Sequence, residues 1–147
     1  MAGKVGKTMG MILKMHVEAG CLCVAAIGEF SLAEAKRAFL EVLDAVARHK
    51  MEKVLLDGRE LAGEPATMAR FYYGEFAAQA VAMSAKRRAS RAPQFAYVLK
   101  VPVRDPRRFG ETVAVNRSMH VKVFDNLEEA HRWLGLGPAN KPDAGDA

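Results

Sequence analysis

The sequence contains few of the residues that usually mark a metal-binding or redox protein. It has two cysteines, four histidines and one tryptophan among 147 residues. The cysteines are Cys21 and Cys23, and no second Cys or His pair stands at the spacing of a structural zinc site. The histidines are scattered and form no H-x-x-x-H pair. We therefore predict two reduced, buried thiols that act as small hydrophobic side chains, with no metal and no other cofactor.

Long apolar segments are also absent. No run approaches the about 20 apolar residues that span a bilayer. Residues 1–8 include lysines, but the apolar core of a signal peptide does not follow them. These absences predict a cytoplasmic protein without a membrane span.

The positive charge is concentrated in one segment. The formal net charge is +5, and eight basic residues but only one acidic residue lie between Lys86 and Arg108. Such a segment attracts phosphate groups or an acidic partner, or it combines a basic helix end with a solvated loop. We favour the second interpretation. No aromatic platform for stacking bases accompanies the basic residues, so we predict no nucleic-acid binding.

No local motif specifies a reaction. The G-x-S-x-G turn of serine hydrolases is missing, and no serine has a recognisable activating neighbour. Asp57 closes an apolar segment and could act as a general base, but an aspartate there more often accepts backbone N–H bonds. We favour the structural role and predict that the chain is not an enzyme.

The composition is that of one globular domain. Half of the residues are hydrophobic and 27% are charged, and the length suits a single core. We predict one domain over residues 10–136, between flexible tails at residues 1–9 and 137–147.

The hydrophobic pattern alternates between strands and helices. Capping sequences begin at Ser31 and Asn126, with Glu34 and Glu129 three residues later. For the second long helix we expect Met68, Phe71, Tyr72, Phe76, Ala80 and Met83 to face inward. A helix between two buried strands implies a parallel pair. The fold class is therefore α/β, with a mixed, mostly parallel sheet of about five strands and about four helices. Predicted strands cover residues 11–17, 21–27, 53–57, 95–101 and 120–124, and predicted helices cover residues 32–48, 65–88, 109–117 and 127–134.

The passage from Lys53 to Thr67 is the most informative. It predicts a buried strand ending at Asp57, a turn-rich loop, and a helix starting near Pro65. Loops beyond the carboxyl ends of parallel strands commonly bind ligands or partners. Thr67 could accept a phosphate at the helix start or simply cap the helix. Arg70 could hold an anion there or pair with Glu64.

Two stretches give the chain a resemblance to a known family. The strand-to-helix junction from Val54 to Thr67 and the ending from His120 to Ala130, with its F-x-x-x-E-E-A pattern, are similar to the STAS domain. This is the fold of the bacterial anti-sigma-factor antagonist SpoIIAA. The resemblance covers about residues 10–136 and is closest to the SpoIIAA-like branch, which is grouped with the SEC14 lipid-binding folds.

The resemblance implies a regulatory, non-enzymatic domain that binds a protein partner, such as a regulator or a kinase. A homodimer is left open. Some STAS domains are switched by phosphorylation of a serine or threonine in the docking segment. This chain lacks the usual Asp-Ser pair there, and Thr67 is the nearby hydroxyl. The residues assigned to docking or phosphorylation are Gly63, Glu64, Pro65, Thr67, Arg70 and Phe71.

The SEC14 side of the resemblance implies an alternative, a carrier of a small molecule or lipid. Phe71, Tyr72, Phe76 and Tyr97 would then line an apolar pocket between helix and sheet. A carrier should contain an internal apolar cavity of a few hundred Å³. An interaction domain should have a filled core and an exposed patch around Gly63 to Phe71.

Overall fold

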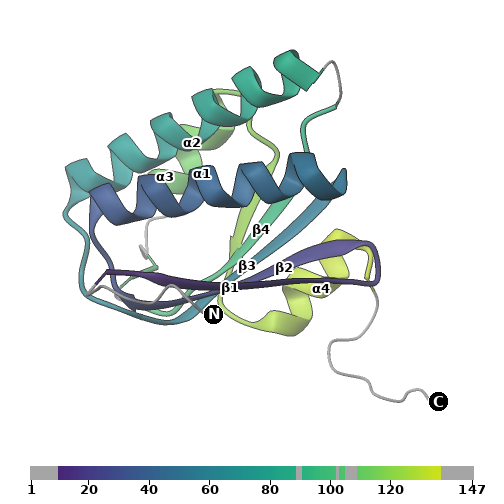
Figure 1. Ribbon diagram of the computed structural model, residues 1–147. Helices are drawn as coiled ribbons and strands as arrows, with labels where there is room; N and C mark the ends of the chain where they lie inside the picture. The colour runs from purple at the N-terminus through teal and green to yellow at the C-terminus, as the bar shows by residue number, and fades with distance from the viewer. Residues whose placement is uncertain (1–9, 89–90, 102, 105–108, 137–147) are drawn as a thin grey trace.

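The chain folds into a five-stranded sheet with four helices, in the order β-β-α-β-α-β-α-β-α (Figure 1). The computed structural model describes residues 10–88, 91–101, 103–104 and 109–136. Both predicted tails, residues 1–9 and 137–147, lie outside the described residues. The elements are β1 (Ile12–Glu18), β2 (Cys21–Glu29), α1 (Leu32–His49), β3 (Lys53–Ala62), α2 (Thr67–Arg88), β4 (Gln94–Val98), α3 (Phe109–Asn116), β5 (Val121–Phe124) and α4 (Leu127–Leu134).

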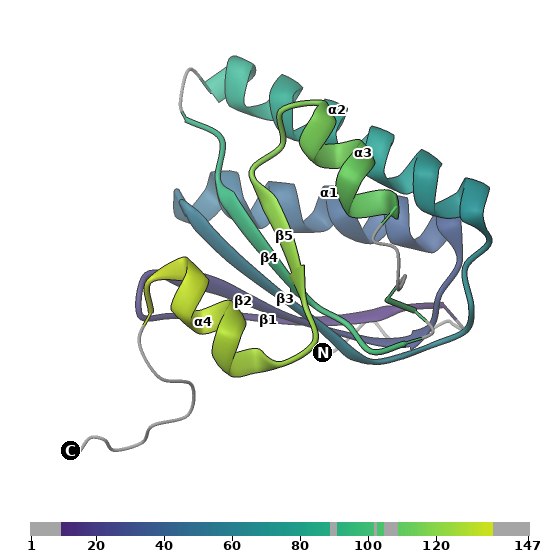
Figure 2. The ribbon, with the colours of Figure 1, turned by 180° about the vertical axis from the view of Figure 1, so that it is seen from behind.

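The sheet confirms the predicted fold class. Its strands lie in sequence order, β1-β2-β3-β4-β5. β1 and β2 form an antiparallel hairpin, and the pairs β2–β3, β3–β4 and β4–β5 are parallel. Each parallel step in one direction requires a crossover of the same hand, so α1, α2 and α3 collect on one face. α4 follows the last strand and covers part of the other face (Figures 1 and 2).

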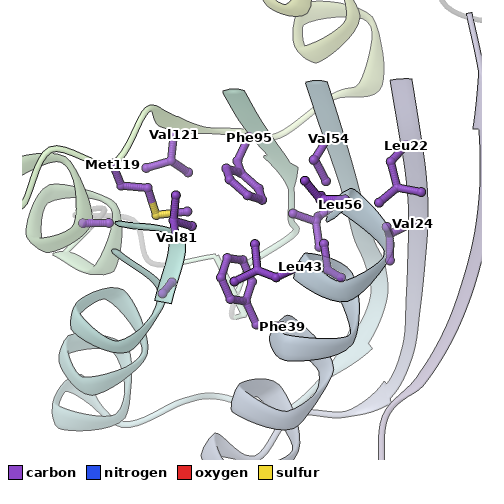
Figure 3. Packing of buried hydrophobic residues seen from close by; sticks show 14 of the residues in the cluster. Leu22, Val24, Phe39, Leu43, Val54, Leu56, Val81, Phe95, Met119 and Val121 are labelled. Carbon is purple, nitrogen blue, oxygen red and sulfur yellow. The ribbon is translucent and has the colours of Figure 1, made fainter. Parts of the chain in front are cut away.

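The alternation of side chains along the central strands divides the core in two. Leu22 and Val24 of β2 point toward the helix layer, where they join Phe39 of α1 and Phe95 of β4 (Figure 3). Cys21 of β2 points to the opposite face and joins a smaller cluster beneath α4. Both faces of β2, β3 and β4 are covered, and this explains why the sequences of these strands are nearly continuous runs of apolar residues.

β3 is longer than predicted. The residues after Asp57, expected to form a loop, continue the strand as far as Ala62. Asp57 pairs with Ala25, but Glu60 pairs with Ile27, so one extra residue of β3 is accommodated in a bulge at Gly58 and Arg59. A bulge lets a strand continue through glycine and charged residues that normally interrupt one. The loop proper is reduced to residues 63–66.

The predicted inward face of α2 is right only in part: Phe76 and Ala80 pack against the main core, but they are not the most buried residues of the helix. The buried residues of α2 are small, namely Gly74, Ala77, Ala78, Val81 and Ser84. Met68, Tyr72 and Met83 are instead exposed. Both sets recur at helical spacing, so periodicity alone could not choose between them. Small side chains face inward because α2 packs closely against α1 and α3.

None of the helices in the described part of the chain has both the length and the hydrophobicity that crossing a membrane requires.

The predicted N-caps of α1 and α4 are confirmed. Ser31 Oγ accepts a hydrogen bond from the Glu34 backbone N–H at 3.2 Å. Asn126 Oδ1 accepts one from the Glu129 N–H at 2.8 Å. Each bond satisfies an N–H group that has no partner within its own helix. The caps therefore define where the two helices begin.

Replacing Ser31 by alanine should lower the free energy of unfolding by about 1 kcal/mol, since the Glu34 N–H loses its acceptor. Urea titration followed by circular dichroism measures this change. Ser31→Asp supplies another acceptor and should restore most of the lost stability. Equal stability of Ser31→Ala and the parent chain would contradict the assigned cap.

Candidate functional site

An apolar cavity of about 150 Å³ lies between the helix layer and the sheet. Its floor is formed by strand residues such as Leu56, Tyr97 and Val121, and its roof by helix residues such as Phe39 and Ala77. The small inner residues of α2 explain the space, because Gly74 and Ala77 do not reach far toward the sheet. Native cores rarely contain voids much larger than a water molecule. This cavity is therefore the candidate binding site of the described residues.

Two tyrosine hydroxyls form the polar centre of the cavity. Tyr73 Oη of α2 and Tyr97 Oη of β4 lie 2.5 Å apart, at hydrogen-bonding distance. Burial raises the pKa of both phenols, so both hydroxyls remain protonated at neutral pH. The pair can therefore donate a hydrogen bond to a buried acceptor, but neither tyrosine is suited to act as a base.

Charged side chains also line this cavity. They are the guanidinium groups of Arg70 and Arg104 and the carboxylate of Glu111. Glu111 Oε2 accepts a hydrogen bond from the Val123 backbone N–H at 3.1 Å, which ties α3 to β5. Within the described residues, the buried Nε of Arg104 meets no hydrogen-bond acceptor. A buried N–H without an acceptor is a position that a ligand oxygen could satisfy.

The structure places one of the four predicted pocket residues in the cavity. Tyr97 lines the cavity, but Phe71, Tyr72 and Phe76 do not. Phe71 carries Arg117 over its ring at 5.7 Å, and Phe76 lies in a shallow groove between α1 and α2. The residue that the sequence interpretation missed is Tyr73, one position from Tyr72. The stripe of small residues on α2 could have identified Tyr73 as a cavity residue, because Tyr73 lies four positions before Ala77 and therefore on the same side of the helix.

The predicted docking segment is a loop and the first turn of α2. Pro65 is buried and Arg70 and Phe71 are half-buried, whereas Glu64 and Thr67 are exposed. Gly63 has φ of +107°, a conformation that favours glycine. Next to these residues, the exposed side chains of Met68 and Tyr72 form an apolar patch, 53% and 45% accessible.

Thr67 does not occupy the capping position of α2. The Ala66 carbonyl accepts the hydrogen bond from the Arg70 N–H at 3.1 Å. Ala66 is therefore the N-cap, and Thr67 is the first helical residue. Its exposed hydroxyl lies at the positive end of the helix dipole.

Asp57 has the structural role that we favoured. Its Oδ1 accepts from the Arg59 backbone N–H at 3.2 Å and from Nε at 2.8 Å, and Oδ2 accepts from Nη2 at 2.7 Å. Burial alone would raise the pKa of Asp57, but these bonds and the Arg59 charge hold it below its ordinary value. A carboxylate held in this way is a poor general base at neutral pH.

The two cysteines differ from each other. Cys21 is fully buried as predicted, but Cys23 is half-buried. Cys21 Sγ donates to the Leu22 carbonyl at 3.7 Å and Cys23 Sγ to the Cys21 carbonyl at 3.9 Å. The neighbouring Cys23 thiol, together with burial, raises the pKa of Cys21. The Cys21 thiol lowers the pKa of Cys23 to about 7 despite burial, and His16 contributes to the lowering. The prediction of two buried thiols is therefore right for Cys21 and wrong for Cys23, which is half-buried.

The basic segment is partly described. Lys86, Arg87 and Arg88 form the last turn of α2, as expected for residues that complement the helix dipole. Asp105, Arg107 and Arg108 lie outside the described residues. Of the remaining basic residues, Arg104 turns out to line the cavity.

The chain is similar to known proteins in both sequence and fold. The SpoIIAA-like family model matches residues 21–135. No curated protein matches the sequence. Among solved structures, an anti-sigma factor antagonist from Mycobacterium paratuberculosis aligns with a TM-score of 0.56 at 12% identity, covering 89% of this chain and 99% of that one. An uncharacterized protein from the DUF3478 family with a SpoIIAA-like fold, from Shewanella loihica PV-4, aligns with a TM-score of 0.47 at 15% identity, covering 90% and 99%.

The structural likeness supports the fold, and the family model covers most of the chain, including all of β2 through α4. This chain therefore belongs to the SpoIIAA-like family.

Proposed function

We propose that residues 10–136 form a non-catalytic binding domain that takes up a small, mostly apolar molecule in the cavity between α2 and the sheet. The cavity is the observation that carries this proposal. The cavity is apolar and partly open to the surface, so a small ligand can enter it and make packing contacts with its walls.

The volume of the cavity and its polar groups indicate which class of ligand it can hold. Cavities of this volume hold a molecule about the size of benzene. Lipid sites are larger, usually several hundred Å³, so a whole lipid is a poorer candidate than a small ring or short chain. The Tyr73 and Tyr97 hydroxyls and the Arg104 Nε favour a ligand with one oxygen acceptor, such as a phenol or carboxylate, over a cationic one.

Filling the cavity tests the proposal. Ala77 is 1% exposed and lines the cavity, whereas Ala82, five residues on, is exposed. Small aromatic probes, such as phenol and benzoate, should stabilise the parent chain by about 2.7 kcal/mol at a 100-fold excess over Kd. For a chain of this length the gain corresponds to a rise in Tm of roughly 5–10 °C. Ala77→Leu should abolish the rise because leucine occupies the space.

Ala82→Leu is the matched control on the same helix, and it should leave the Tm rise unchanged. Benzylamine, a cationic ring, should give a smaller rise than benzoate. Native mass spectrometry of the purified chain adds an independent readout of a retained ligand. Equal responses of Ala77→Leu and Ala82→Leu to the probes would contradict the assigned site.

A second candidate function is docking of a protein partner on the start of α2. The exposed Met68 and Tyr72 side chains support it, since they form an apolar patch beside the loop at residues 63–66. The fold of an anti-sigma factor antagonist supports a partner in a regulatory system. The docking surface would consist of the loop, Thr67, Met68 and the outer sides of Arg70 and Phe71.

Met68 and Met83 provide a matched pair for this surface, because both lie on α2 and are 53% and 54% exposed. Neither Met68→Glu nor Met83→Glu should change the free energy of unfolding by more than about 0.5 kcal/mol. A photo-crosslinking residue at position 68 should capture a defined partner in extract of the source organism, and Met68→Glu should abolish its binding. Equal capture of the same partner from position 83 would contradict the assigned docking surface.

Thr67 is the proposed phosphate acceptor on that surface. Its place in the first turn of α2 favours a dianion through free backbone N–H groups and the helix dipole. Incubation with cell extract and ATP, followed by mass mapping, should give phosphate on Thr67 and none in Thr67→Ala. Thr112 is an exposed threonine in α3 and serves as the internal control. Absence of phosphate on Thr67, or equal labelling of Thr112, would remove the switch.

A further inference from the structure

The hairpin of β1 and β2 brings together three metal-ligating side chains that are separate in the sequence. His16 of β1 stands directly opposite Cys23 of β2 in the antiparallel register, and Glu18 follows two residues after His16. Side chains alternate along a strand, so His16 and Glu18 share one face, and Cys23 joins them from the neighbouring strand. The register itself therefore creates a His-Glu-Cys cluster.

The ligand atoms of these residues converge on one point. One ring nitrogen of His16, one carboxylate oxygen of Glu18 and the Cys23 Sγ all lie within 4.8 Å of one another. The His16 Nε2 and Glu18 Oε1 are 3.0 Å apart. A tetrahedral zinc ion with bonds of about 2.0–2.3 Å holds its ligand atoms roughly 3.3–3.8 Å apart. Small side-chain rotations would therefore bring the three atoms to coordination distance.

We propose that His16, Glu18 and Cys23 bind a borderline-soft divalent transition-metal ion of the Zn²⁺ class. One thiolate, one imidazole and one carboxylate are the ligand types that this class prefers. A magnesium or calcium ion would instead require oxygen ligands almost exclusively. Thiolate and carboxylate together also balance the double positive charge of the ion.

The surroundings leave the site open on one side. The side chains of His16 and Glu18 are 64% and 71% accessible. α4 packs mainly against β3, β4 and β5, and Cys21 of β2 joins the cluster beneath it. Three protein ligands leave a fourth tetrahedral position for water or for a group from another molecule. Cys21 is fully buried on the same face of β2, two residues from Cys23.

The simpler interpretation of the same residues is an isolated surface ion pair between His16 and Glu18. Such exposed pairs contribute about 0–1 kcal/mol and need no third partner. The presence of Cys23 at the same point distinguishes the two interpretations, because a thiolate ligand has a spectroscopic signature that an ion pair lacks.

Cobalt substitution tests the site directly. The full chain, without a histidine tag and under reducing conditions, is titrated with Co²⁺ and then with Zn²⁺. We expect one tetrahedral Co²⁺ per chain, with a thiolate charge-transfer band that Zn²⁺ removes by displacement. Since the sequence has only two cysteines, the band must come from Cys23 or Cys21.

The variants identify the ligands. Cys23→Ser should abolish the band, and His16→Ala or Glu18→Gln should weaken Zn²⁺ binding by at least about tenfold. These two residues are exposed, so neither variant should affect folding. His49→Ala, at an exposed histidine in α1, should bind as the parent chain does. The proposal is overturned if no thiolate band appears, if the band depends on Cys21 instead, or if His16→Ala binds Zn²⁺ with unchanged affinity.

Discussion

The close packing of α2 through small side chains is the constraint on which the other features depend. Gly74, Ala77 and Ala78 let this helix approach α1 and α3, so it joins the helix layer without filling the space above the sheet. Larger residues at these positions would push the helices apart or fill the cavity. The aromatic and methionine side chains of α2 must then lie elsewhere, and several of them reach solvent.

The first turn of α2 therefore contributes residues to both the cavity and the proposed docking surface. Pro65 and Arg70 line the cavity, whereas Thr67 and Met68, between them in the sequence, are exposed to solvent. Packed interiors transmit displacement because they are dense and nearly incompressible. An occupant of the cavity and a partner on the surface would contact opposite sides of the same loop and helix start.

The sheet divides the molecule into two unequal faces. Three helices cover one face and enclose the main core, whereas α4 covers mainly β3, β4 and β5 and the start of β2 on the other face (Figure 2). The edge strand β1 is therefore the most exposed strand of the sheet. His16, Glu18 and Cys23 lie on the face opposite the three helices, because Leu13 and Met15 of β1 pack toward the helices.

The amino-acid sequence by itself determined the order and type of the elements. Local signals carried that information: the cap residues Ser31 and Asn126, the continuous apolar strands and the turn before Cys21 all act over a few positions. Only the tertiary structure decided which side of α2 faces inward, because its two stripes share the same period and packing against α1 and α3 selects the smaller one. It also decided that Tyr73 joins Tyr97, because that pair depends on how α2 and β4 are placed in space, and no spacing along the chain encodes that placement. The pairing of His16 with Cys23 is more local, since the two-residue turn at Ala19 and Gly20 sets the register of the hairpin.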